Sequence, residues 1–144
     1  MNKKKRRLAV VLATVTGSAV LVLSGCSGKS EQTEKTLRVG VITYSQDDPF
    51  INGLTEELKV QLKAMENKER RIIVSTKSGN DDQQEQNEKV EEMIDAGCDV
   101  LCINLVDRTA PSRIVRMARN EDIPVIFFNR EPVREDLMQW EKLY

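Results

Sequence analysis

Two acidic residues and an aromatic residue follow a short apolar run in the first third of the chain. The run Val39–Tyr44 leads into Asp47, Asp48, Pro49 and Phe50. A carboxylate accepts hydrogen bonds from hydroxyl groups, and an aromatic face can stack on apolar C–H groups. A polyol offers both kinds of group. The pattern therefore indicates binding of a polyol rather than catalysis.

A second polar group follows a later apolar run. Asn104 comes directly after Val100–Ile103. Its amide can both donate and accept, which suits a hydroxyl group. In open parallel α/β sheets, ligands bind outside the carboxyl ends of the strands. If the two runs are neighbouring parallel strands, Asp48, Phe50 and Asn104 face one cleft.

Each of these residues also has a purely structural explanation. Asp48 before Pro49 suits a helix N-cap followed by proline at the first helical position. Phe50 could belong to the core, as most aromatic residues do, and Asn104 could simply make a turn. Asp107 is better explained as the cap of the next helix than as a ligand. The spacing alone leaves the first three alternatives open.

The elements that must position these residues alternate between strand and helix. We expect strands at 37–43, 71–76, 100–103 and 124–128, helices at 50–66, 81–96 and about 110–118, and a last amphipathic segment at 134–143. Strict alternation predicts a parallel sheet with right-handed crossovers. The doubly wound order 2-1-3-4 sets the first and third strands side by side. The predicted fold class is α/β, with a parallel, doubly wound, Rossmann-like sheet of about four strands.

Other residues are expected to have structural roles only. The first turns of the helix at 81–96 are rich in Gln and Asn, so only its later apolar residues should dock: Val90, Met93 and Ile94. Trp140 lies on the last amphipathic segment and should pack there. Arg130 and Glu131 are predicted to form a solvated ion pair.

The first 25 residues have the pattern of a secretory signal. Residues 3–7 are basic, and the apolar run Leu8–Leu23 is shorter than the roughly 20 residues of a spanning helix. The run ends in Leu-Ser-Gly-Cys, which resembles the lipobox of bacterial lipoproteins. We expect a signal peptide at 1–25, lipidation of Cys26 and a lipidated tether at 26–36, which would hold the protein on a membrane. The alternative is an uncleaved anchor with an incidental cysteine.

Composition excludes several kinds of function. Removing residues 1–25 takes away five of the 22 Lys and Arg and none of the 23 acids, which leaves a net charge of −6 and no basic patch for nucleic acid. The chain has no histidine, which excludes histidine triads and histidine metal sites. Cys98 and Cys102 would lie about 13 Å apart in an extended strand, too far for a disulfide, and their spacing matches no zinc motif.

Three segments resemble the glucose/galactose-binding proteins, which are the receptors of sugar ABC importers and have the type I periplasmic-binding-protein fold. The segments are 37–50, 103–107 and 124–132. The likeness covers about residues 37–144. It implies that Asp48 binds sugar hydroxyls, Phe50 stacks on one sugar face and Asn104 hydrogen-bonds the sugar. Pro49 departs from the polar residue expected between the acid and the aromatic.

Members of that family are about twice as long and have two lobes that close on the ligand. The resemblance implies an incomplete N-terminal sugar-binding lobe at 37–130, a hinge near 128–130, and the start of a crossover toward a second lobe at 131–144. It implies no cofactor here, because the family's calcium site lies in the second lobe. It also implies a monosaccharide ligand, an ABC permease as partner and a lipid-anchored, extracytoplasmic location. Half a site predicts weak binding by this chain alone.

Two other classes compete with an importer receptor. One is a sensory or regulatory ligand-binding domain of the same fold, either repressor-like or linked to a chemoreceptor. A repressor would carry a DNA-binding helix-turn-helix where the signal segment stands. The other is an α/β enzyme that uses Asp47 and Asp48 as acid and base. Because these acids are adjacent, their side chains should diverge rather than flank a substrate, so we expect no enzymatic activity.

Overall fold

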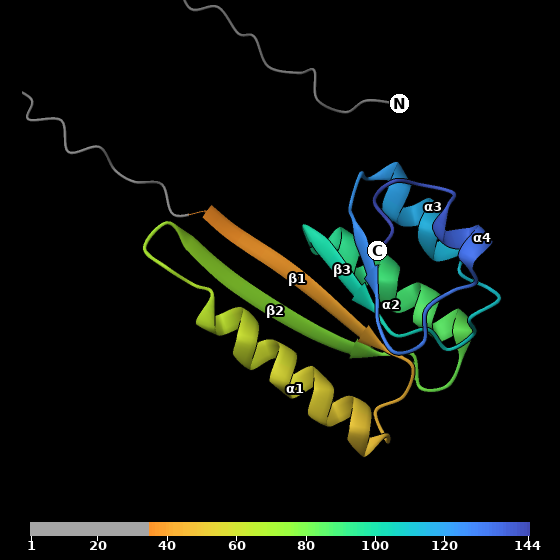
Figure 1. Cartoon of the computed structure of the whole chain (residues 1–144), viewed down its shortest axis with the longest axis horizontal. Helices are drawn as coiled ribbons and strands as arrows, with labels where there is room; N and C mark the ends of the chain where they lie inside the picture. Colours follow the sequence, from red (N-terminus) through yellow and green to blue (C-terminus); the bar gives the residue numbers. More distant parts are fainter. Residues whose placement is uncertain (1–34) are drawn as a thin grey trace, which may run out of the picture. The chain divides into compact units, whose positions relative to one another are not determined.

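The computed structural model describes residues 35–144, which alternate between strands and helices in the predicted order (Figure 1). The strands are β1 (Lys35–Thr43), β2 (Arg70–Ser78), β3 (Val100–Ile103) and β4 (Val125–Phe127). The helices are α1 (Pro49–Ala64), α2 (Gln83–Asp95), α3 (Ser112–Asn120) and α4 (Arg134–Leu137). β1 begins two residues before the predicted start, and α4 is shorter than the predicted amphipathic segment.

The four strands form one parallel sheet with the order β2-β1-β3-β4. Val39 of β1 is in register with Val74 of β2 and with Val100 of β3. The predicted doubly wound α/β fold is therefore confirmed. The four strands all end at one edge of the sheet. We call the loops that follow them, at 44–48, 79–82, 104–111 and 128–133, the carboxyl edge.

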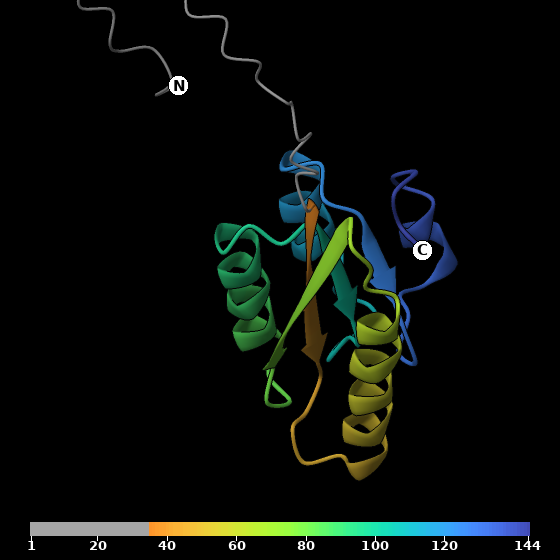
Figure 2. The same cartoon turned by 90° about the vertical axis from the view of Figure 1, so that its left-hand side faces the viewer.

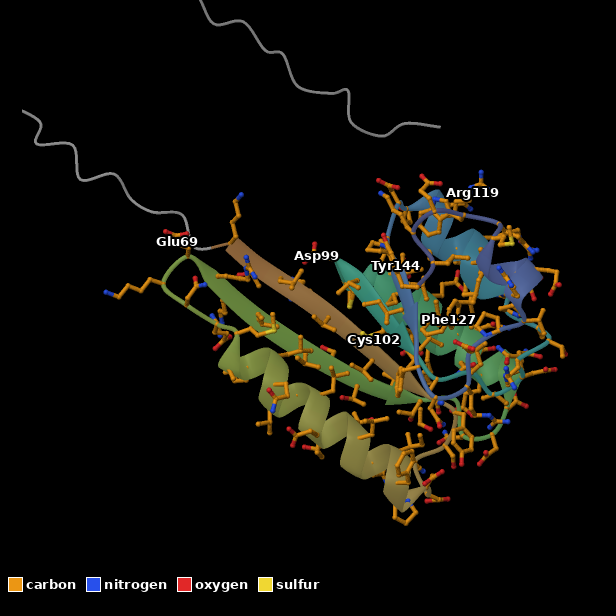
Figure 3. The ribbon with its side chains drawn as sticks, in the orientation of Figure 1. Glu69, Asp99, Cys102, Arg119, Phe127 and Tyr144 are labelled. Carbon is orange, nitrogen blue, oxygen red and sulfur yellow. The ribbon has the colours of Figure 1, made fainter. Side chains whose placement is uncertain are left out.

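The last three described residues run along the outer side of β4. Val125 N–H donates to Lys142 O at 3.0 Å, and Tyr144 N–H donates to Val125 O at 2.9 Å. Phe127 N–H donates to Tyr144 O at 2.7 Å, and both residues are labelled in Figure 3. The segment 142–144 thus covers the backbone of β4 on the side away from β3.

Helices cover both faces of the sheet, but unequally (Figure 2). The α2/α3 face holds the larger buried cluster, with residues from both helices, the strands and the C-terminal segment: Ile42, Val90, Met93, Cys98, Leu101, Ile103, Leu105, Ile114, Val115, Ala118, Ile123, Val125, Phe127, Trp140 and Leu143. The predicted packing of Trp140 is confirmed. The α1 face buries Val39, Val41, Ile72 and Cys102, against which Leu58 and Leu62 of α1 pack while partly exposed.

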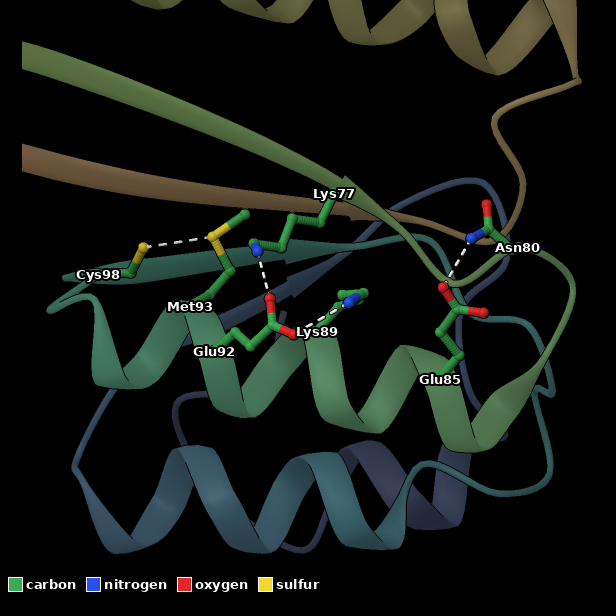
Figure 4. A network of polar contacts seen from close by, with 7 residues as sticks. All are labelled: Lys77, Asn80, Glu85, Lys89, Glu92, Met93 and Cys98. Atoms are coloured by element: carbon green, nitrogen blue, oxygen red, sulfur yellow. Dashed lines mark hydrogen bonds and ion pairs between the residues drawn. The ribbon is translucent and has the colours of Figure 1, made fainter.

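Polar contacts fix α2 against the end of β2 (Figure 4). Glu92 accepts from Lys77 of β2 and, at 2.9 Å, from Lys89 of its own helix. Both bonds lower the pKa of the Glu92 carboxyl, and the bond from Lys77 has the larger effect. Asn80 Nδ2 donates to Glu85 Oε1 at 2.7 Å near the start of the helix.

The two cysteines of the described part are free and buried, as the sequence predicts. Cys98 Sγ lies 3.9 Å from Met93 Sδ in the core (Figure 4). Burial raises the pKa of Cys102 to about 11. Both thiols therefore act as small apolar side chains.

The predictions for the signal peptide, for Cys26 and for most of the tether fall outside the described residues. Within 35–144, none of the helices combines the length and the apolar character that crossing a bilayer requires.

Candidate functional site

Asp48 lies at the N-terminus of α1 and caps it. Its Oδ1 accepts from the backbone N–H of Phe50 at 2.8 Å and of Ile51 at 3.3 Å. Pro49 then occupies the first helical position, where the lack of an N–H costs nothing. The capping role that competed with ligand binding in the sequence is therefore real. It uses only one of the two carboxylate oxygens.

The other oxygen of Asp48 faces Tyr44, which the sequence analysis did not select. The Tyr44 hydroxyl donates to Asp48 Oδ2 at 2.6 Å. This bond is the main reason why the pKa of Asp48 lies below its ordinary value, with the helix N–H groups adding to it. The same bond raises the pKa of Tyr44. Asp48 is thus an ionised acceptor at neutral pH.

Arg130 from the loop after β4 lies over the ring of Tyr44. Its Cζ is 4.5 Å from the ring centroid, which is a cation–π contact. The predicted solvated ion pair between Arg130 and Glu131 is wrong, because the Arg130 guanidinium lies over the Tyr44 ring instead. The Glu131 carbonyl instead accepts from Arg108 Nε at 2.6 Å.

Phe50 projects into solvent from the first turn of α1. Its side chain is 66% exposed, whereas the next residue, Ile51, is fully buried. The alternative that placed Phe50 in the core is therefore wrong. An exposed ring two residues from the Asp48 carboxylate can stack on a ligand.

Asn104 lies at the end of β3 and is fully buried. Its Oδ1 accepts from Tyr44 N–H at 3.3 Å, and its Nδ2 donates to Phe128 O at 3.1 Å. The side chain therefore joins the ends of β1 and β4 across β3. An amide oxygen has two lone pairs and an amide nitrogen two hydrogens, so each atom keeps one position unused by these bonds.

Gln86 of α2 contradicts the prediction that only the apolar residues of this helix dock. Its side chain is fully buried, donates from Nε2 to Asn104 O at 2.9 Å and accepts at Oε1 from Val106 N–H at 3.0 Å. Gln83, one turn earlier, accepts from Asp107 N–H at 2.8 Å. The glutamines at the start of α2 thus hold the loop after β3.

The loop after β2 is tied to the loop after β1. Asp81 N–H donates to Tyr44 O at 2.8 Å, and Asp81 Oδ2 accepts from Ser45 Oγ at 2.8 Å. The backbone is left-handed at two consecutive residues of this loop, Asn80 (φ 48°) and Asp81 (φ 62°). Asn and Asp tolerate that region better than most residues.

Asp107 does not cap α3, contrary to the prediction. The helix begins at Ser112, after Pro111, and has no side-chain cap. Asp107 instead accepts from the Oγ1 and the N–H of Thr109, at 2.7 and 2.8 Å, and these bonds lower its pKa. The cause of the difference is the loop after β3, which is longer than the sequence suggested.

The structure brings the predicted site residues to one edge of the sheet. Tyr44 connects two of them, because its N–H binds Asn104 and its hydroxyl binds Asp48. Phe50 follows Asp48 within two residues. The sequence analysis missed three residues of this edge: Tyr44, Arg130 and Gln86. Tyr44 and Arg130 could have been found as an aromatic residue and a cation that follow strands, and Gln86 as part of a run of glutamines at the start of a helix. Residues 35–144 contain no group of three or more acids or cysteines placed to hold a metal.

These groups fit recognition of hydroxyls better than bond cleavage. The edge carries an ionised acceptor, an exposed ring and a cation. Asp47 contributes its backbone N–H, to Ser45 Oγ at 3.3 Å. Asp48 is committed to the helix and to Tyr44.

Comparison with known proteins places this edge in context. The profile of the periplasmic binding protein domain matches residues 39–140. The chain belongs to the periplasmic binding protein family. A curated relative, the D-galactose/methyl-galactoside binding periplasmic protein MglB of Haemophilus influenzae, is 30% identical over 138 aligned positions, and the match covers 93% of this chain.

Solved structures of the same family share the fold. The fructose-binding periplasmic domain of a hybrid two-component system is 27% identical, with a TM-score of 0.60, over 74% of this chain and 32% of its own. A solute-binding protein of an ABC transporter from Clostridium phytofermentans, with bound β-D-glucose, is 26% identical, with a TM-score of 0.55, over 62% of this chain and 26% of its own. The chain spans 38% of the length of the Haemophilus relative.

Proposed function

We propose that this chain is the N-terminal sugar-contacting part of an extracytoplasmic receptor that binds a monosaccharide of the glucose or galactose type and delivers it to an ABC permease. The proposal includes no catalytic activity. It rests on one observation above all: a restrained carboxylate and an exposed aromatic ring lie next to each other at the carboxyl edge of a periplasmic binding protein sheet. The names of the relatives, which bind galactosides, glucose or fructose, support this ligand class.

In this proposal Asp48 accepts a sugar hydroxyl and Phe50 stacks on the C–H face of the ring. A carboxylate accepts at about four positions, and three are occupied by Phe50 N–H, Ile51 N–H and the Tyr44 hydroxyl. One position on Oδ2 remains for the ligand. Asn104 contributes through the unused position on its oxygen or nitrogen, which requires a small opening of the loops that bury it.

Sugar binding can be tested by NMR titration of the ¹⁵N-labelled full chain with D-galactose and with D-glucose. We expect binding weaker than micromolar, with shifts centred on Phe50 and Asp48. Asp48→Asn should weaken binding by at least about tenfold, since a hydrogen bond to a charged group is lost. Phe50→Ala should weaken it several-fold.

Asp47→Asn is the matched control, because it removes the same charge from the neighbouring residue and should leave the affinity unchanged. Absence of any shift at high millimolar sugar would overturn the proposal. Micromolar affinity would contradict the expectation that this chain carries only half a site.

Lipid anchoring through Cys26 is a separate part of the proposal, supported by the signal pattern in the sequence. Labelled palmitate supplied to cells that express the chain should be incorporated into it. Cys26→Ser should abolish the label, and Cys98→Ser should retain it. Label that persists in Cys26→Ser would rule out this anchor.

A sensory receptor is the second candidate, because one structural neighbour is the periplasmic domain of a hybrid two-component system. Deletion of the gene separates the two. An importer receptor predicts loss of sugar uptake, whereas a sensor predicts normal uptake and loss of the transcriptional response to the sugar.

A further inference from the structure

Tyr44 lies between the proposed sugar-binding carboxylate and a cation from another loop. Its hydroxyl donates to Asp48 Oδ2 at 2.6 Å, and Arg130 covers its ring at 4.5 Å. Its backbone is fixed on both sides, since its N–H donates to Asn104 Oδ1 and its carbonyl accepts from Asp81 N–H. Tyr44 is therefore held by contacts from the other three loops of the carboxyl edge, two to its backbone and one to its ring.

The bond from Tyr44 determines which direction of Asp48 stays open. Oδ1 is used by two backbone N–H groups of α1, so rotation of the carboxylate would break the cap. Oδ2 already accepts from Tyr44, which leaves one lone pair. A ligand hydroxyl must approach along that remaining direction.

Arg130 is itself held in place by the backbone around it. Asn129 adopts a left-handed conformation (φ 58°), Arg130 N–H donates to Phe128 O at 2.6 Å, and Arg130 O accepts from Leu105 N–H at 3.3 Å. The loop after β4 thereby places a planar cation over the phenol. A guanidinium can stack in this way, whereas an ammonium group cannot match its planar contact.

We propose that Tyr44 and Arg130 are positioning residues of the sugar site, with Arg130 fixing the Tyr44 ring and Tyr44 directing the single open acceptor position of Asp48. This inference rests on the proposed function. It goes beyond the residues expected to touch the sugar, and it couples the loop after β4 to the affinity of the site. It predicts that Asp48 accepts one sugar hydroxyl and not two.

The first test measures the contacts without any ligand. In a ¹³C-carboxyl titration, Tyr44→Phe should raise the pKa of Asp48 toward its ordinary value, because the main bond that lowers it is gone. In a Tyr144→Phe background Tyr44 is the sole tyrosine of the chain, so ultraviolet absorbance follows its phenol alone. Arg130→Ala should raise the pKa of Tyr44 further, because the cation lowers it.

The second test measures affinity for galactose and glucose by the same NMR titration. Tyr44→Phe should weaken binding roughly tenfold, as expected for a lost hydrogen bond to a charged group. Arg130→Ala should weaken it several-fold, and Arg130→Lys should restore only part of the loss. Tyr144→Phe and Arg113→Ala are the matched controls, since the Tyr144 ring is exposed and Arg113 pairs with Glu91 on the surface.

The outcomes separate the two proposals. Sugar binding of unchanged or higher affinity in Tyr44→Phe would overturn the positioning role and leave the receptor function intact. Unchanged titrations of Asp48 and Tyr44 in the variants would overturn it as well. A parent chain that binds no sugar, although the titrations shift as expected, would reject the proposed function and with it the role of these contacts in binding.

Discussion

The two faces of the sheet differ in how they hold their helices. The α2/α3 face buries fifteen residues of the described chain in one cluster, and α2 adds the buried bonds of Gln86. The cluster on the α1 face has four buried residues. α1 adds the buried Ile51 and Thr55 near its start, but its later turns pack through partly exposed side chains such as Leu58 and Leu62. Yet α1 carries Asp48 and Phe50 at its start. The proposed ligand-contacting residues therefore lie on the helix with the smaller core, and the loop contacts of its N-terminus position them.

Ile103→Ala should cause the largest loss of stability. Ile103 is fully buried in a central strand on the α2/α3 face, so its truncation should lower the free energy of unfolding by about 4 kcal/mol. Leu62→Ala on the α1 face should cost only about 1 kcal/mol, because that side chain is partly exposed. Urea denaturation of both variants measures the difference. Equal losses would show that the two faces contribute alike.

Gln86→Ala should cause the next largest loss and lower the free energy of unfolding by about 3 kcal/mol, because it leaves the Asn104 carbonyl and the Val106 N–H without their partner. Gln84→Ala on the exposed side of α2 is the control and should change stability little. If urea midpoints of the two variants coincide, the glutamine does not stabilise the carboxyl edge as described.

Gly53→Ala should stabilise α1 by about 1 kcal/mol. A Cβ at this position meets nothing within 4 Å, and alanine favours a helix interior over glycine by about that amount. Gly97→Ala should instead destabilise the fold, because Gly97 has a φ of +78°, which alanine adopts only with strain. Thermal melts of both variants compare them. A gain at Gly53 without any change in sugar affinity would show that the stability of α1 does not limit the site.

The smallest effect concerns acid pH. Because the folded pKa of Asp48 is lowered, its charge contributes stability that is present above the unfolded pKa of about 3.9 and is lost as the pH falls through the folded value. Asparagine caps helices about as well as aspartate. The urea midpoint of Asp48→Asn should therefore lie below that of the parent at pH 6, and the two should converge toward pH 3. A constant gap across this range would contradict the assignment.

The sequence was sufficient to predict the element order, the parallel sheet and its 2-1-3-4 arrangement, because strict alternation of apolar runs and helical periods permits few topologies. For the same reason it correctly placed Asp48, Phe50 and Asn104 at the carboxyl edge. It could not decide whether each of these residues has a ligand-binding role or a purely structural one. Phe50 is exposed because the neighbouring Ile51 fills the buried position, which depends on the rotation of α1 about its axis.

The polar contacts of the edge were harder to predict. Gln86 looks like a surface residue in a polar segment, and only the arrival of two loops over the start of α2 makes it a buried partner. Tyr44 and Arg130 are more than eighty residues apart, so their contact depends on the shape of two loops rather than on any local pattern. The sequence predicted that Asp107 caps the next helix, but that helix begins at Ser112, five residues after Asp107.

The segment 142–144 has a consequence for solubility. It occupies the N–H groups of Val125 and Phe127 and the carbonyl of Val125, which would otherwise form an open strand edge. Such an edge can pair with another chain and start aggregation. At the opposite edge, Glu66 Oε1 accepts from Ile72 N–H at 2.7 Å and places a carboxylate against β2. The backbone of 142–144 thus covers the β4 edge, and a carboxylate occupies the β2 edge at Ile72.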